Sequence, residues 1–225
     1  RVFQDLNDDG ERQEGEPSVL TDPYGRFFLP RLGPSERAVL EPAESCVDAG
    51  TRQPVRVRMS SLPRAAAEGD GFRQANQTSL IISPLTQLAV SMMQQGNLTV
   101  NDSAVLLTGR LGLRSFVPTD DGARALLESY DPYAMLLDGV DDGVGTAVVS
   151  TTVQISSLLR EVGAVLASAS APLDGNTAEG GTFGGSRRAY LEEEQGEMLA
   201  AAEQNTLSAL ATKLLAGSRT GASDP

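Results

Sequence analysis

The spacing of apolar residues changes once along this chain, at Ser83-Pro84. Upstream, short apolar runs are broken by Pro and Gly, and Val55–Met59 alternates with a period of two, which is typical of a half-buried strand. Downstream, apolar residues recur at helical spacing, and the first stripe comprises Leu85, Leu88, Ala89 and Met92. The sequence therefore predicts an α+β chain, with its strands first and its helices second.

Residues 1–62 are predicted to form a small β-domain, which this chain holds in whole or in part. Its expected strands are Val2-Phe3, Val19-Leu20, Arg26–Leu29, Ala38–Leu40 and Val55–Met59. Residues 63–79 are small and polar and are expected to form a linker. Residues 80–225 are then predicted to form an all-α helical domain.

The helical domain is expected to begin with short helices. Pro84 suits the first turn of a helix that ends at Gly96. Asp102 and Asp121 each precede an apolar helical pattern, so they are expected to cap the next two helices. A further short helical segment is expected after Pro132, and the last two helices are predicted to be long.

The predicted helix over about 145–169 is apolar on more than one face. Its apolar positions are Val148, Val149, Val153, Ile155, Leu158, Leu159, Val162, Val165 and Leu166. Such a helix is normally covered on most sides, and the shorter helices and a final helix over about 187–216 can cover only part of it. We expect further cover from a neighbouring module or another copy of the protein; the alternative is that the helices close on themselves.

The chain is acidic and contains no histidine. Its net charge of −12 and pI near 4.4 argue against nucleic acid or an anionic membrane surface as the main partner. No apolar run approaches the roughly 20 residues that span a bilayer, so no membrane insertion is expected in this segment. Without histidine the chain lacks the commonest general base, the usual triads and most zinc sites. We expect a non-enzymatic protein; the alternative is an extracellular hydrolase that uses a carboxylate pair.

Seven acidic residues crowd into the stretch from Asp5 to Asp22, opposed only by Arg12. Part of this stretch fits the calcium-loop pattern D-x-[DN]-x-[DN]-G-x5-E, in which Gly10 permits the sharp turn. Calcium takes six to eight oxygen ligands, which alternate side chains of such a loop supply. The predicted calcium ligands are the side chains of Asp5, Asn7, Asp9 and Glu16, the backbone carbonyl of Glu11 and, as a further ligand, Asp22.

Two other interpretations of the acidic stretch remain open. It is a solvated turn if no cation binds, although its carboxylates would then repel one another at close range. It is a calcium-responsive, EF-hand-like switch if helices flank it. The flanking sequences RVFQ and PSVLTDPYGRFFLP carry strand and turn signals, so calcium is expected to brace a β-domain. Asp22 lies in the second turn, TDPYG, where an ordinary turn aspartate is the alternative.

The same stretch resembles the calcium-braced SdrD B-like repeats of large surface adhesins. The matching residues are Phe3, Asp5, Asn7, Asp9, Gly10, Gly15-Glu16-Pro17, Thr21-Asp22, Gly25 and Phe27. A looser resemblance to such surface proteins continues over 46–170, through Asp48–Thr51, Ser83–Leu88 and Asp131–Tyr133. The resemblance implies a calcium-braced β-sandwich-like domain followed by helices, within a microbial or algal adhesin-like or filament protein at the cell surface or in a surface appendage.

Three glycosylation sequons and one cysteine give information on the cellular compartment of the protein. Asn76, Asn97 and Asn101 each begin an N-glycosylation triplet, which is consistent with a secreted glycoprotein if the source is eukaryotic. Cys46 is either a free buried thiol or the partner of a cysteine outside this chain. Because Arg1 is not an initiator methionine, we expect the chain to be part of a longer, processed protein.

Overall fold

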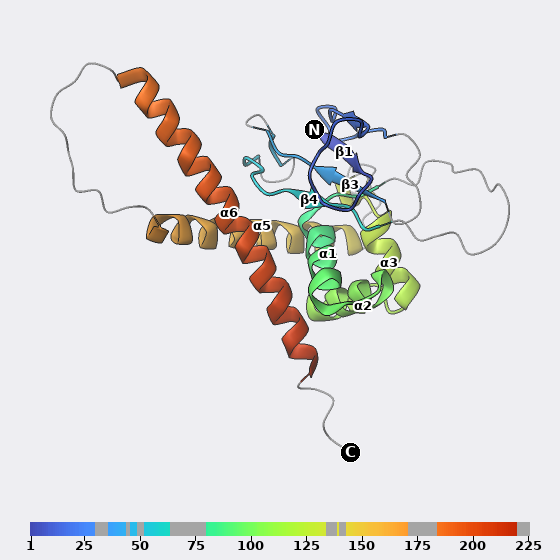
Figure 1. The fold of residues 1–225 in the computed structure, drawn as a ribbon. Helices are drawn as coiled ribbons and strands as arrows, with labels where there is room; N and C mark the ends of the chain where they lie inside the picture. The colour runs from blue at the N-terminus through green and yellow to red at the C-terminus, as the bar shows by residue number, and fades with distance from the viewer. Residues whose placement is uncertain are drawn as a thin grey trace.

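A small antiparallel sheet packs against a set of helices in the computed structural model (Figure 1). The structure describes residues 1–29, 36–43, 46–48, 52–63, 80–133, 139, 143–170 and 184–219. The strands are β1 (Val2–Asp5), β2 (Ser18–Val19), β3 (Arg37–Leu40) and β4 (Met59–Ser60), and their order in the sheet is β2-β1-β3-β4. The predicted α+β class is confirmed at this level.

Three of the expected strands are present within one or two residues of their predicted bounds, and two are missing or mostly missing. Arg26–Leu29 forms no strand, because the Asp22 backbone N–H bonds to the Arg26 carbonyl at 2.8 Å and closes the preceding turn on itself. The alternation nevertheless persists, since Leu29 is buried while Phe28 is exposed. In Val55–Met59 only Met59 lies in a strand, although Val57 and Met59 are both buried as the alternation predicts.

The helices follow the predicted order. They are α1 (Pro84–Gly96), α2 (Val100–Arg110), the short 3-10 helix η1 (Leu113–Ser115), α3 (Asp120–Glu128), α5 (Val144–Ser170) and α6 (Gly184–Arg219). The predicted caps of α2 and α3 are wrong by a few residues. Thr99 and Thr119 occupy the N-cap positions, while Asp102 and Asp121 lie in the first turns, where the helix dipole favours negative charge.

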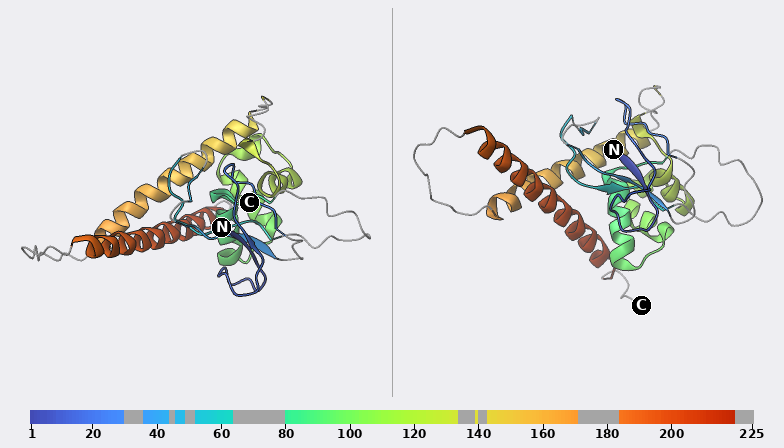
Figure 2. Two further views of the ribbon diagram at one scale, coloured as in Figure 1. Left: turned by 90° about the horizontal axis from the view of Figure 1, so that it is seen from above. Right: turned by 45° about the horizontal axis from the view of Figure 1, so that its top comes forward.

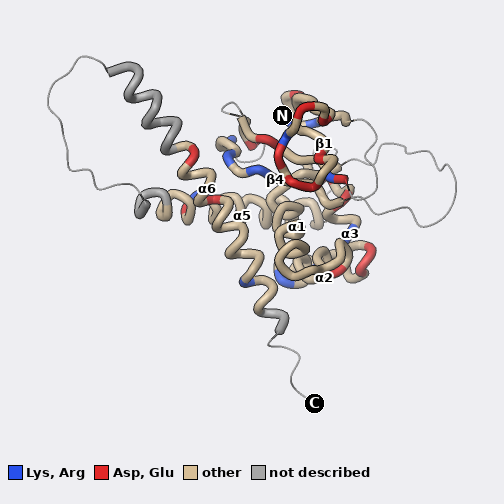
Figure 3. The backbone as a smooth tube through the Cα atoms, in the orientation of Figure 1, with Lys and Arg blue, Asp and Glu red and all other residues tan. Residues whose placement is uncertain are grey.

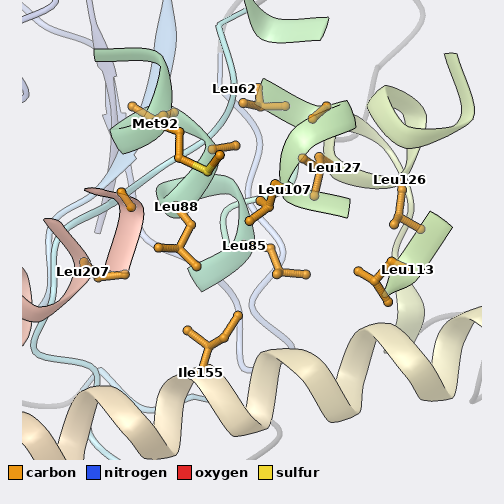
Figure 4. Close-up of a cluster of buried hydrophobic side chains, with 14 of the residues drawn as sticks. Leu62, Leu85, Leu88, Met92, Leu107, Leu113, Leu126, Leu127, Ile155 and Leu207 are labelled. Atoms are coloured by element: carbon orange, nitrogen blue, oxygen red, sulfur yellow. The ribbon is translucent and has the colours of Figure 1, made fainter. Parts of the chain in front are cut away.

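One apolar core unites the helices (Figure 4). The predicted α1 stripe is buried on this core, and Ile155 of α5 and Leu207 of α6 point toward it from the long helices. Val57 and Leu62, which precede α1 in the sequence, belong to the same core. Ile82, which lies just before α1, packs against a second cluster of buried residues formed by Val2, Leu29 and Ala38, so apolar contacts join the N-terminal and helical parts of the chain.

The start of α1 covers the outer edge of β4. The Ser60 backbone N–H donates to Gln87 Oε1 at 2.8 Å, and the Ser60 carbonyl accepts from Thr86 Oγ1 at 2.8 Å. An unpaired strand edge is a template for unwanted pairing, and these side chains satisfy it. The sheet and α1 are thereby joined by hydrogen bonds as well as by apolar packing. Residues 64–79 of the expected linker lie outside the described residues.

The two long helices cross each other closely (Figure 2). A Cβ atom on Gly163 of α5 would lie 2.6 Å from Glu203 Cγ of α6, so the absence of a side chain permits the approach. Gln95 Nε2 of α1 donates to Ser208 Oγ at 2.8 Å and ties α6 to the body of the molecule. Of the helices that the structure describes, none combines the length and apolarity required to cross a membrane.

Candidate metal centre

The acidic stretch forms the connection between two paired strands. Val2 pairs with Val19 and Phe3 with Ser18, and the Gln4 N–H donates to the Pro17 carbonyl at 2.9 Å. Residues 5–16 therefore form a hairpin loop beside β1, where Figure 3 shows Asp and Glu gathered. Hairpin loops usually have about 2–5 residues, so a loop this long requires contacts of its own to stay folded.

Asp5 anchors the loop at the end of β1. The residue is only 1% exposed, and its Oδ2 accepts a hydrogen bond from the Gly10 N–H at 3.0 Å. Gly10 adopts a φ of +74°, a conformation that a side chain would disfavour. Among the described residues, Asp5 Oδ1 is buried without a hydrogen-bond partner. A buried carboxylate oxygen without a donor is energetically costly and is a candidate cation ligand.

Asn7 and Asp9 lie at the exposed outer part of the loop and contact each other. Asn7 Nδ2 donates to Asp9 Oδ2 at 2.8 Å, and Asp9 Oδ1 accepts from the Glu11 N–H at 2.7 Å. The Glu11 N–H bond is the main reason that the pKa of Asp9 is lowered, with further help from Asn7, Gln13 and the charge of Arg58. Asp9 therefore keeps its negative charge readily.

Glu16 closes the loop from its other end. Its Oε1 accepts from the Leu6 N–H at 3.0 Å, and its Oε2 accepts from the Gln13 N–H at 2.8 Å. Both carboxylate oxygens of Glu16 are therefore turned toward the loop backbone. This reach across the loop is what the last position of a calcium loop requires before it can hold an ion with both oxygens.

Among the described residues, no hydrogen bond or ion pair joins Asp22 to the loop. Its Oδ1 accepts from the backbone N–H groups of Tyr24 and Arg26, both at 2.8 Å. These bonds organise the separate turn after β2, as an aspartate at the start of a turn commonly does.

Two arginines near the loop were missed by the sequence analysis. Arg37 of β3 forms ion pairs with Asp5, at 3.3 Å between Nη2 and Oδ2, and with Asp8. Arg58 Nη1 donates to the Gly10 carbonyl at 2.7 Å. The contact of Arg37 with the loop can be predicted only when the strand register is known, because the register places Arg37 directly across from Asp5.

The oxygen atoms of the loop are of the chemical type that calcium binds, although in this structure they do not form a preformed coordination site. Within the described ranges, no three Asp, Glu, His or Cys side chains form a group that could hold a metal. The loop carboxylates contact backbone N–H groups and arginines instead. Asn7 and Asp9 are exposed, and Asp5 Oδ1 has no hydrogen-bond donor to lose when a cation binds. Hard oxygen donors of this type are those that calcium prefers.

The sequons and Cys46 lie away from the loop in the sequence. Asn97 is exposed at the end of α1, with a φ of +50°, and Asn101 is half-buried in the first turn of α2. Asn76 lies outside the described residues. Cys46 is half-buried and is a free thiol in this structure. These positions leave glycosylation and intermolecular disulfide formation as predictions.

In comparisons with known proteins, no family model, no curated protein and no solved structure matches this chain. The resemblance to surface-adhesin repeats therefore remains an expectation from the sequence motif.

Proposed function

We propose that this chain is a non-enzymatic structural or adhesive module of a large extracellular surface or filament protein, rigidified by calcium at the loop of residues 5–16. The observation that carries the proposal is the buried Asp5 carboxylate, whose Oδ1 lacks a donor at the first position of a calcium-loop motif. The resemblance to SdrD B-like repeats supports the surface location.

The proposed ligands are the side chains of Asp5, Asn7, Asp9 and Glu16 and the carbonyl of Glu11. Calcium would supply positive charge to a loop that is rich in carboxylates. Asp22 is left out of the proposed set, because its Oδ1 is engaged in the turn after β2. The ligand residues would hold the two ends of the hairpin at a fixed separation.

Stiffening of the loop would extend beyond the hairpin. Asp5 is the last residue of β1, which pairs with β3, and β3 pairs with β4. The side chains of Thr86 and Gln87 then join β4 to α1. A cation at the loop would therefore restrain the orientation of the sheet on the helices, which is a suitable property for a load-bearing surface module.

The proposed partners are neighbouring modules or further copies of a surface protein. Three large apolar side chains are exposed on α5, and they are Leu158, Val165 and Leu166. Single exposed apolar residues are common, but this group lies on the helix for which the sequence predicts incomplete cover. Its exposure supports a partner surface in the assembled protein.

The two alternatives have less support. An EF-hand-like switch requires helices on both sides of the loop, whereas β1 and β2 flank it here. A hydrolase with its site in the helical half would require a pair of carboxylates placed for acid–base work, and the buried Glu203 there has Arg56 as a charged neighbour at 4.0 Å. We therefore favour a structural role, in which calcium rigidifies the loop and the sheet.

Isothermal titration calorimetry of the whole chain with calcium tests the proposal. We expect one site per chain, with a Kd in the range of about 10⁻⁴–10⁻³ M that is usual for extracellular modules. Asp5→Asn should weaken binding at least about tenfold, since it removes a ligand charge, whereas the control Asp22→Asn should leave the Kd within about twofold. Absence of heat and of competition with a calcium indicator would refute the site.

A further inference from the structure

Arg37 lies where the loop meets the sheet, and it is almost as buried as Asp5. Only 5% of it is exposed, and its Nη2 contacts the carboxylates of both Asp5 and Asp8. The β1–β3 register sets Arg37 opposite Asp5, so the backbone fixes this pairing. Its Nε is also buried without a hydrogen-bond partner among the described residues. Arg37 is thus held by charged contacts with the loop, while part of its hydrogen-bonding capacity stays unused among the described residues.

The position of Arg37 gives it two opposite effects on the loop. A guanidinium stays charged when buried, so it offsets the repulsion between Asp5 and Asp8 when no metal is bound. The same charge repels a cation that approaches Asp5. Both effects follow from Coulomb's law at a separation of a few ångströms.

We propose that Arg37 is the built-in counter-ion of the acidic loop: it keeps the loop folded without metal and lowers the loop's affinity for divalent cations. The proposal rests on the proposed function, because it concerns the same site. It assigns an affinity-setting role to a residue that belongs to the sheet and not to the calcium-loop motif. Such a residue would adjust the site to a calcium-rich environment, where weak binding is sufficient.

The experiment replaces Arg37 by methionine, which keeps an unbranched apolar stem of similar length. Calcium binding to the whole chain is measured by calorimetry, and folding is followed by circular dichroism in calcium and in chelator. We expect R37M to bind calcium about tenfold more tightly than the unmodified chain, and to melt at a lower temperature in chelator. The two changes together distinguish a counter-ion from a residue that only supports the fold.

Arg12→Met is the matched control, because Arg12 lies in the same loop but pairs with Glu41 at 3.1 Å. Arg12→Met also removes one positive charge, in this case from the loop itself. The Kd of this variant for calcium should differ from that of the unmodified chain by less than about threefold. An R37M variant that binds more weakly, or no more tightly than R12M, overturns the proposal and leaves the site intact. If neither the unmodified chain nor R37M binds calcium, both proposals fail.

Two further outcomes are decisive. If R37M binds calcium and the unmodified chain does not, the counter-ion role is supported while the native calcium function is refuted. If R37M is unfolded in chelator and folds on addition of calcium, the role is also supported, since the ion then replaces the lost charge. An R37M chain that stays unfolded in both conditions shows that Arg37 is only structural, and overturns the proposal.

Discussion

The direction in which the pKa of an acidic side chain shifts in this chain depends on how deeply that side chain is buried. Asp9 is exposed and its pKa is lowered by the Glu11 N–H, whereas Glu203 is buried where α5 and α6 cross and its pKa is raised. Burial is the main cause of the Glu203 shift, and the charges of Arg56 and Arg160 only partly oppose it. The Arg56 contact is long, with 4.0 Å between Nη1 and Oε1.

The first prediction concerns Glu203. Because its pKa is higher in the folded chain than its ordinary value of 4.5, the folded state is penalised as Glu203 ionises when the pH rises. Glu203→Gln removes this penalty, so the variant should melt about 1–3 °C higher at pH 7. The difference should shrink as the pH falls toward 4.5. Thermal melts across this pH range measure it.

Glu197→Gln is the control, since Glu197 lies on the exposed side of the same helix. It should leave the melting temperature unchanged at pH 7. Equal effects of the two substitutions, or destabilisation by Glu203→Gln, would contradict the assigned burial penalty.

At the scale of elements, a glycine at the crossing point decides how closely the long helices α5 and α6 meet. Gly163 of α5 faces Glu203 of α6, and an added Cβ would lie 2.6 Å from Glu203 Cγ and 3.4 Å from its backbone nitrogen. Gly196 of α6 has no heavy atom within 4 Å of such a Cβ. The two glycines therefore have different roles within similar helices.

The second prediction compares alanine at these two glycines. Gly163→Ala should destabilise the chain by about 1–3 kcal/mol, because the helices must separate at the crossing. Gly196→Ala should stabilise it by about 0.5–1 kcal/mol, because alanine is the better helix former. Denaturant unfolding of both variants gives the values. Stabilisation by both substitutions would show that α5 and α6 do not approach closely in solution.

The elements differ in how far the sequence predicts them. Repeated apolar spacing over many residues locates α1, α5 and α6 within a few positions, since a long pattern outweighs local ambiguity. The short strands depend on partners: Arg26–Leu29 has strand-like alternation, yet the Asp22 turn precedes it and no ladder forms among the described residues. The loop motif is visible in the sequence, whereas Arg37 requires the β1–β3 register, a long-range contact that local patterns do not encode.

For the whole molecule, the loop, the sheet and the helices form a connected series. β1 carries Asp5 at its end, β4 is tied to α1 through Ser60, and α1 is tied to α6 through Gln95. The helical core includes Val57 from the segment before β4. Stability gained at the loop should therefore raise the stability of much of the chain and not only of the hairpin.

The most direct test of the calcium brace is thermal unfolding of the whole chain in calcium and in chelator. At calcium about a hundredfold above Kd, binding to the folded state alone adds about 2.7 kcal/mol, so the helical signal should melt several degrees higher than in chelator. The double variant Asp5→Ala, Asp9→Ala should melt at the same temperature in both conditions. If the unmodified chain also melts at one temperature in calcium and in chelator, the calcium brace is contradicted.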